Sequence, residues 1–334
     1  MARKTRKSAP PAIALTGTSG FVGSSLLREL EKDPAYRHVV AIDYRKPPFE
    51  TTKTKFYRLD LTETLADSKL LEILEKENVE TLVHAAIPVS PPHDLSWAHE
   101  LVSVGTMYVL DACAAWKVKK LVFASTTEVY GAHATNPNFL SEDHPMHGGF
   151  KSRFLKDKIE AELQAQKFAR KHPETVVTIL RPSTILGPNV RNYKTNFLQS
   201  PVIFTVMGYD PLLQFVHEED VIRAFKLSLD KDYPGIFNIV GDGVLPLSKV
   251  LKLAGKLSLP VPAPLLYPIV QLLWYGNVVP APASRLDFLK YLSVADGTKA
   301  KKTMGFTARY STKETLLSFI GAQRLREVNL LEAT

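Results

Sequence analysis

The chain has 334 residues, of which 45% are hydrophobic and 23% are charged, as in an ordinary globular protein of one or two domains. Its single cysteine, Cys113, excludes an internal disulfide and a multi-cysteine zinc site, so we predict no metal site and a reducing, cytoplasmic location. The net charge of +8 permits anionic partners. We interpret the basic residues 1–10 as a flexible tail and expect no nucleic-acid partner.

Short apolar segments alternate with helical patterns through the first half of the chain. Uniformly apolar strands separated by helices indicate an α/β fold, a Rossmann-type doubly wound parallel sheet covered on both faces. In chain order, the sequence predicts strands at 12–17, 38–44, 54–61, 79–86, 119–126 and 175–182, helices at 21–33, 68–78 and 95–116, and a further helix starting within 147–162.

The second half of the chain has a looser pattern. We predict a Rossmann domain over 11–188, with its sheet completed by parts of 213–242, and a smaller C-terminal substrate-binding region over most of 189–334. The proline-rich apolar segment 260–282 is predicted to be irregular. Core packing, the wall of an apolar pocket and peripheral contact with a membrane are three open roles for it. The sequence has no run of about 18 or more apolar residues, so it predicts no ordinary transmembrane helix.

The motif ALTGTSGFVG lies between the first predicted strand and the first predicted helix. Glycines allow a tight turn and a close approach of the backbone to a pyrophosphate, and the helix N-terminus offers free N–H groups. Because a strand precedes the motif and a helix follows it, we predict a dinucleotide site there. The expected contacts are Gly17, Thr18, Ser19, Gly20, Phe21, Val22 and Gly23.

An acidic residue, Asp43, ends the second predicted strand. A carboxylate at this place can accept hydrogen bonds from both ribose hydroxyls and would repel a 2′-phosphate. We therefore predict NAD rather than NADP. Arg45 and Lys46 lie close by, and a phosphate held by either of them is the alternative.

Five further positions belong to the predicted cofactor site. Asp60 follows the third strand, where it would contact the adenine amino group or serve as a turn residue, and Leu61 is its neighbour. Ala85 and Ala86 end the fourth strand, where small side chains let a cofactor pass closely. We also include Pro182, at the end of the sixth strand, among the expected contacts.

These motifs, together with LDLT, HAA, LVFASTTEVYG, FLKDKIEAE, LRPSTILGP and FVHEEDV, resemble the extended short-chain dehydrogenase/reductase family. Within it the chain looks most like the NAD-dependent epimerase/dehydratase group, in an atypical subgroup similar to UDP-glucose 4-epimerases. The resemblance implies hydride transfer with bound NAD, a nucleotide sugar or related small molecule as substrate, and a homodimer.

The resemblance also implies a catalytic set, which this chain keeps only in part. The family uses a tyrosine as general base, a lysine that lowers the tyrosine's pKa and holds the ribose, and a Ser/Thr hydroxyl near the substrate oxygen. Thr126 and Lys158 match the hydroxyl and the lysine. Phe154 stands at the tyrosine position, and Val102 stands where an asparagine is common. A tyrosinate-assisted reaction at this position is therefore excluded.

Two other groups are candidates for the missing base. Glu128 falls where dehydratases and decarboxylases of the family carry a catalytic glutamate, and a structural acceptor is its alternative role. His147 lies just upstream of the helix and would titrate near neutrality, although a plain loop histidine is the alternative. We expect Tyr130, His84 and His217 to have packing roles.

The substrate side departs from the family pattern as well. Leu213 stands where an arginine commonly holds the diphosphate, and Thr184 stands where an asparagine is common. Arg191, Lys194 and Arg285 are alternative sources of positive charge. We hypothesise a less anionic or more hydrophobic ligand.

Two functions remain open at this point. The first is an epimerase/dehydratase-like oxidoreductase with a rearranged base, which the retained Thr126, Glu128 and Lys158 favour. The second is an inactive NAD(H)-binding regulatory or scaffold protein, which Phe154 and Val102 favour.

Overall fold

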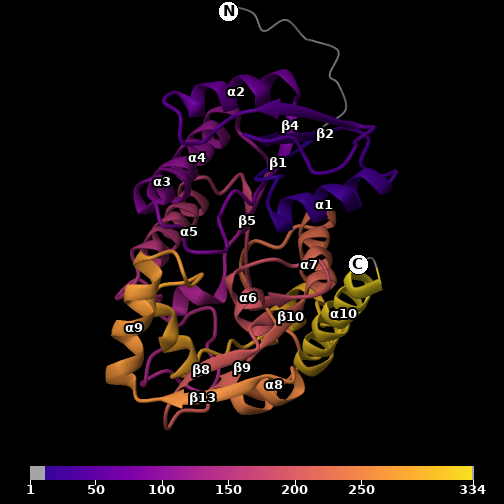
Figure 1. The fold of residues 1–334 in the computed structure, drawn as a ribbon. Coiled ribbons are helices and arrows are strands. Elements are labelled where there is room, and N and C mark those ends of the chain that lie inside the picture. Colours follow the sequence, from indigo (N-terminus) through magenta and orange to yellow (C-terminus); the bar gives the residue numbers. More distant parts are fainter. Residues whose placement is uncertain (1–11, 333–334) are drawn as a thin grey trace, which may run out of the picture.

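The structure, a computed structural model, describes residues 12–332, and the predicted basic tail lies outside the described residues. A seven-stranded parallel sheet forms its centre (Figure 1), so the predicted doubly wound fold is confirmed. The strand order is β11-β6-β5-β4-β1-β2-β3. The strands are β1 (Ala12–Thr16), β2 (Val39–Asp43), β3 (Thr54–Arg58), β4 (Val79–His84), β5 (Lys120–Ala124), β6 (Val176–Pro182) and β11 (Gly235–Ile239).

Helices cover both faces of this sheet, which explains why the inner strands are apolar throughout. Every residue of β2, for example, is buried. One face carries α2 (Ala66–Lys76), α3 (Leu95–His99), α4 (Gly105–Trp116) and α5 (Arg153–Lys171), and the other carries α1 (Phe21–Lys32) and α7 (Glu218–Asp230).

One predicted helix differs from the structure. The helix predicted over 95–116 is divided into α3 and α4 by a π-helical segment, Glu100–Val104, which contains the fully buried Val102. The helix predicted to start within 147–162 begins at Arg153, after Ser152 caps it. The residues before it form a turn, in which the Gly148 N–H donates to the Val129 carbonyl.

The C-terminal half forms three separate two-stranded sheets below the central sheet in Figure 1. Of the range 213–242, parts of which were predicted to complete the central sheet, β11 joins that sheet, whereas β9 and β10 pair with β12 and β7. These elements are β7 (Thr184–Leu186), α6 (Tyr193–Gln199), β8 (Val202–Val206), β9 (Leu212–Leu213), β10 (Phe215–His217), β12 (Leu245–Pro246), α8 (Leu247–Leu253), β13 (Leu257–Val261), α9 (Ala263–Tyr275) and α10 (Thr312–Glu332).

The proline-rich segment is not irregular, because it contains β13 and helix α9. Pro264 lies in the first turn, where no backbone N–H is needed, and Pro268 removes one hydrogen bond from the helix interior. Burial of Leu266 and Trp274 offsets that loss. Among residues 12–332, no helix combines the length and the apolar character needed to cross a membrane.

Candidate functional site

The predicted cofactor residues gather at one edge of the central sheet, where its parallel strands end. From β1 the chain proceeds outward to β2 and β3, whereas β4, β5 and β6 extend in the opposite direction. The gap between β1 and β4 is therefore the switch point at which such folds bind their ligands. Gly17, Asp43, Ala85 and Pro182 lie at the ends of β1, β2, β4 and β6.

The glycine loop is packed tightly against β4. Gly17 has a φ of +75°, and a side chain there would place its Cβ 2.5 Å from the Ala85 carbonyl carbon. A Cβ on Gly23 would collide with the Gly17 carbonyl, whereas one on Gly20 would lie 3.3 Å from that same oxygen. Two of the three glycines are thus required by the turn itself.

Helix α1 begins at this loop with its positive end available. Gly20 caps it with extended backbone, no side chain caps the helix, and its first turn holds no acidic residue. The first-turn N–H groups and the helix dipole therefore suit a phosphate. Thr18 adds a buried hydroxyl that has no hydrogen-bond partner among the described residues.

The Asp43 carboxylate ties this loop to the end of β2. Its Oδ2 accepts a hydrogen bond from the Ser19 N–H (2.8 Å), and its Oδ1 accepts from the Ser19 hydroxyl (3.0 Å) and the Arg45 N–H (3.1 Å). A carboxylate has about four lone-pair sites. One site remains for a ribose hydroxyl, and the Ser19 hydroxyl would have to turn away for a second.

Asp60 serves as a turn residue, which was the alternative role considered for it. Its Oδ1 accepts hydrogen bonds from the Thr62 N–H (2.9 Å) and hydroxyl (2.8 Å), which closes the turn after β3. Leu61 beside it packs against Gly105, where an added Cβ would lie 3.1 Å from the leucine Cβ.

Lys158 and Phe154 lie together on α5, as their spacing predicts. Both side chains are buried, and the Lys158 amino group lies 4.6 Å from the centre of the Phe154 ring. Burial lowers the pKa of Lys158 to about 8, and the negative charge of Glu128 only partly opposes this. A substantial fraction of this amine is therefore uncharged in mildly alkaline solution.

Glu128 lies at the centre of a charged cluster. Its Oε1 accepts hydrogen bonds from the Tyr193 hydroxyl (2.9 Å) and lies 2.5 Å from Lys194 Nζ, while its Oε2 accepts from Arg285 Nη1 (3.0 Å). Burial opposes its charge, but Lys194, Arg285 and Lys158 hold the pKa of Glu128 well below its ordinary value. Such a carboxylate stays ionised and is a weak proton acceptor.

Tyr193 is the one member of this cluster that the sequence did not suggest. It follows the Asn192 cap of α6 and belongs to no recognisable motif, so only its position beside Lys194 pointed towards it. Burial raises the pKa of Tyr193 well above its ordinary value, and its hydrogen bond to Glu128 adds to this effect. This phenol therefore does not replace the missing tyrosine as a base.

The remaining candidate groups have local partners. The Thr126 hydroxyl accepts a weak hydrogen bond from the Glu128 N–H (3.3 Å) and keeps its own hydrogen available. His84 contacts Thr16 and Thr106 on either side, and burial lowers the pKa of His84 to about 4. His217 stacks on Tyr310. The exposed His147 lies among other aromatic rings.

A cavity of about 340 Å³ opens beside the charged cluster. Glu128, Tyr193, Lys194 and Arg285 form one part of its wall, and β8, β9 with Leu213, α6, α9 and residues 279–289 supply much of the rest. Most of these other side chains are apolar. The segment 260–282 thus contributes to an apolar pocket, one of the three roles considered for it.

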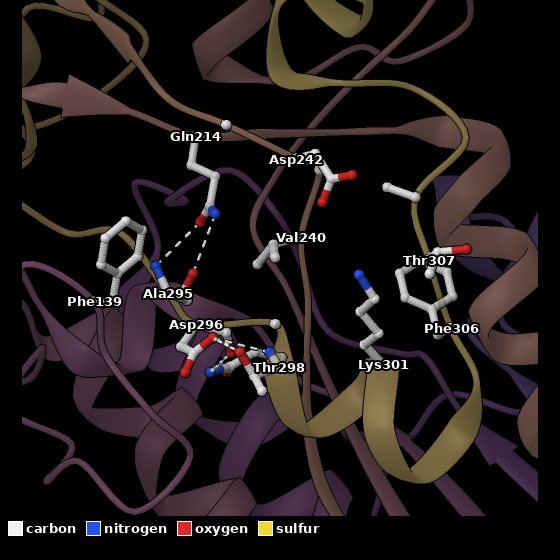
Figure 2. Close-up of a pocket in the computed structure, with 15 residues that line it drawn as sticks. Phe139, Gln214, Val240, Asp242, Ala295, Asp296, Thr298, Lys301, Phe306 and Thr307 are labelled. Atoms are coloured by element: carbon white, nitrogen blue, oxygen red, sulfur yellow. Dashed lines mark hydrogen bonds between the residues drawn. The ribbon is translucent and has the colours of Figure 1, made fainter.

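A second, smaller cavity of about 240 Å³ lies near the end of β11 (Figure 2). Gln214 bonds the backbone of Ala295 on one side, and Asp242 and Lys301 lie on the other. None of the predicted catalytic or cofactor residues lines it.

The fold and the loop at its switch point define a dinucleotide-binding α/β protein. A sequence model of the NAD dependent epimerase/dehydratase family matches residues 13–240, more than half of the chain. The chain therefore belongs to that family, and NAD is its cofactor. The open helix end, the unpartnered Thr18 hydroxyl and the close packing of Gly17 on β4 fit this group.

Several known proteins are similar. An uncharacterized protein of Mycobacterium tuberculosis is 28% identical over 326 residues, covering 96% of this chain and 86% of the relative. A dTDP-D-glucose 4,6-dehydratase of Dictyostelium discoideum is 25% identical and covers 69% and 58%. Among solved structures, MoeE5 with UDP-glucuronic acid and NAD has a TM-score of 0.74 at 24% identity, covering 94% and 99%. The Thermotoga maritima UDP-glucose 4-epimerase has a TM-score of 0.71 at 20% identity, with the same coverage.

Proposed function

We propose that the protein is an NAD-dependent oxidoreductase in which the Lys158 amine replaces the missing phenol as the proton acceptor. The observation that carries this proposal is the buried Lys158 amine on the Phe154 ring, with its pKa lowered to about 8. Two other ionisable groups of the site, Glu128 and Tyr193, are hydrogen-bonded to each other.

The cofactor would be held by the residues at the sheet edge. The α1 N-terminus and Gly20 would face the pyrophosphate, Asp43 a ribose, and Lys158 the nicotinamide ribose. When bound, NAD accepts a hydride from the alcohol carbon of the substrate. We place Thr18, Phe21, Val22, Asp60, Leu61, Ala85, Ala86 and Pro182 around it.

Two side chains would then handle the substrate oxygen. Thr126 donates a hydrogen bond to that oxygen, because its own hydrogen is not used by the Glu128 N–H contact. Neutral Lys158 Nζ takes the hydroxyl proton as the carbonyl forms. The charge of the resulting ammonium is favoured by the negative charge of Glu128.

The substrate alcohol has two candidate classes. UDP-sugars in two of the similar solved structures favour a nucleotide sugar, whereas the apolar cavity favours a hydrocarbon compound. The alternative function, an NAD(H)-binding regulatory or scaffold protein, is favoured by the buried Phe154, which has no hydroxyl to contribute.

The test is reduction of NAD by purified protein with UDP-glucose, UDP-glucuronic acid, dTDP-glucose, menthol or borneol. We expect one class to reduce the cofactor, and we expect Lys158→Met to slow this step by about 100-fold or more. Lys156→Met, on the exposed side of the same helix, serves as the control and should behave as wild type. Tight NAD binding without reduction by any compound would favour the binding protein.

A further inference from the structure

The substrate cavity has few charges, and the carboxylate among its lining residues pairs with both of the cations there. Lys194 and Arg285 are the only cations among its lining residues, and Glu128 is the only acid. Glu128 lies between them, 2.5 Å from Lys194 Nζ and bonded to Arg285 at 3.0 Å. The three groups together keep a net charge of only +1, whereas a nucleoside diphosphate group carries about two negative charges.

Aromatic rings lie close to both cations of the cavity wall. The Arg285 guanidinium lies 5.3 Å from the Tyr193 ring, 5.8 Å from the Phe154 ring and 5.9 Å from the Phe288 ring. Lys194 Nζ lies 6.0 Å from the same Phe288 ring. Arg285 is 6% exposed, and its Nε and Nη2 groups are buried without partners among the described residues. Both cations therefore have apolar ring surface beside them as well as the Glu128 carboxylate.

The rest of the wall is hydrocarbon. Phe197, Ile203, Leu213, Leu266 and Val270 line it, from four different elements. Burying a diphosphate against such a surface without new hydrogen bonds is strongly unfavourable, whereas burying apolar surface is favourable.

We propose that the ligand of this cavity is an uncharged, mostly hydrocarbon alcohol, or the ketone formed from it, and not a nucleotide sugar. The proposal rests on the proposed function only for the alcohol group, which would point towards Thr126 and Lys158. The hydrocarbon part would fill the space between α6, β8, β9 and α9.

The first experiment measures binding alone, by isothermal titration calorimetry of the NAD-loaded protein with borneol, menthol and UDP-glucose. We expect borneol or menthol to bind at least about tenfold more tightly than UDP-glucose. Val270→Trp should fill the cavity and weaken alcohol binding by about tenfold or more, and Val270→Asn, which adds no bulk, should also weaken it. Leu272→Trp, an exposed position of α9, is the matched control and should bind as wild type.

The second experiment tests the role of the internal carboxylate. Glu128→Gln frees both cations from their anion, so UDP-glucose affinity should rise by about tenfold, provided that circular dichroism shows an intact fold. A wild-type protein that binds UDP-glucose more tightly than both alcohols, or binds neither alcohol, overturns the proposal. So does a Glu128→Gln variant that folds and gains no affinity. Alcohol binding without NAD reduction would support this inference and contradict the proposed function, whereas reduction by a UDP-sugar alone would do the reverse.

Discussion

At the scale of single residues, the site is altered by the loss of one hydroxyl group. Phe154 is 2% exposed and packs in the core that covers one sheet face. A phenyl ring keeps nearly the volume of a tyrosine, so the position of Lys158 is preserved without the phenol. Burial of the amine, and the positive charges of Arg285 and Lys194, lower the pKa of Lys158.

Phe154→Tyr restores the phenol next to a buried amine. We expect NAD reduction to become at least about tenfold faster at neutral pH, because Lys158 would lower the pKa of the new hydroxyl. The measurement is the rate of nicotinamide reduction with the preferred substrate. Phe168→Tyr, a buried position on the same helix, is the control. An unchanged rate in Phe154→Tyr would mean that the substrate oxygen does not approach this position.

Glu128→Gln should also lower stability. Removing the charge leaves Arg285 buried beside a neutral partner, and we expect a loss of about 3 kcal/mol in the free energy of unfolding. Because the pKa of Glu128 is lowered in the folded state, its contribution is present above pH 4.5 and is lost as the pH falls below that value. Denaturant unfolding of both proteins at neutral and acidic pH measures the difference. Equal free energies of unfolding for the wild type and Glu128→Gln at neutral pH would contradict a stabilising role of the ion cluster.

The site was only partly predictable from the sequence at this scale. Gly17, Asp43 and Lys158 stand in motifs whose spacing has a local physical cause, and the structure places Gly17 and Asp43 at one edge of the sheet. The Glu128–Lys194–Arg285 cluster joins residues up to 157 positions apart in the sequence, so no local sequence pattern predicts it. Tyr193 enters the site only because α6 packs there.

At the scale of elements, the turn between β1 and α1 has two separate requirements. Gly17 and Gly23 are required by close backbone packing, whereas a Cβ on Gly20 would make one tight contact, 3.3 Å from the Gly17 carbonyl oxygen, which a small shift relieves. Gly20 is therefore the position in this turn at which cofactor binding can be tested with the least disturbance of the fold.

Gly20→Ala should fold and bind NAD at least about tenfold more weakly, because the added methyl group stands where the pyrophosphate meets the helix N-terminus. Calorimetry gives the affinity, and thermal unfolding checks the fold. Gly321→Ala, where an added Cβ meets nothing within 4 Å, is the control. An unchanged NAD affinity in Gly20→Ala would contradict the assignment of the pyrophosphate to this loop.

Elements with a strong hydrophobic periodicity were predictable from the sequence, and elements shaped by contacts between distant parts of the sequence were not. Strands β1, β2, β4, β5 and β6 are largely apolar because helices cover both faces, whereas the edge strand β3 is only partly buried. The π segment at Glu100–Val104 lies against α5, a contact between distant parts of the sequence. Helix α9 forms despite Pro268 because it buries Leu266 and Trp274, which a local proline rule does not include.

At the scale of the whole molecule, the chain combines a predictable sheet with a less predictable C-terminal half. The strands of that half are two to five residues long, and β8 pairs with β13 across more than 50 residues of sequence. Short strands with distant partners leave weak periodicity, so neither their pairing nor the cavity they enclose could be read from sequence.

We propose a homodimer that pairs through α4 and α5. Met107 on α4 and Leu163 on α5 are 42% and 48% exposed, and α4 and α5 are in contact, so the two helices together present apolar side chains for an interface. Sedimentation should give twice the chain mass of 37.2 kDa. Leu163→Lys should shift the protein towards the monomer, whereas the same change at the exposed Leu265 of α9 should not. A monomeric wild type would contradict this arrangement.

The most direct measurement is the pH dependence of NAD reduction by the wild-type protein and by Lys158→Met. If neutral Lys158 is the proton acceptor, the rate rises about tenfold per pH unit, levels off above about pH 8, and loses this dependence in Lys158→Met. A flat wild-type profile, or a Lys158→Met variant that keeps the wild-type profile and rate, would contradict the account.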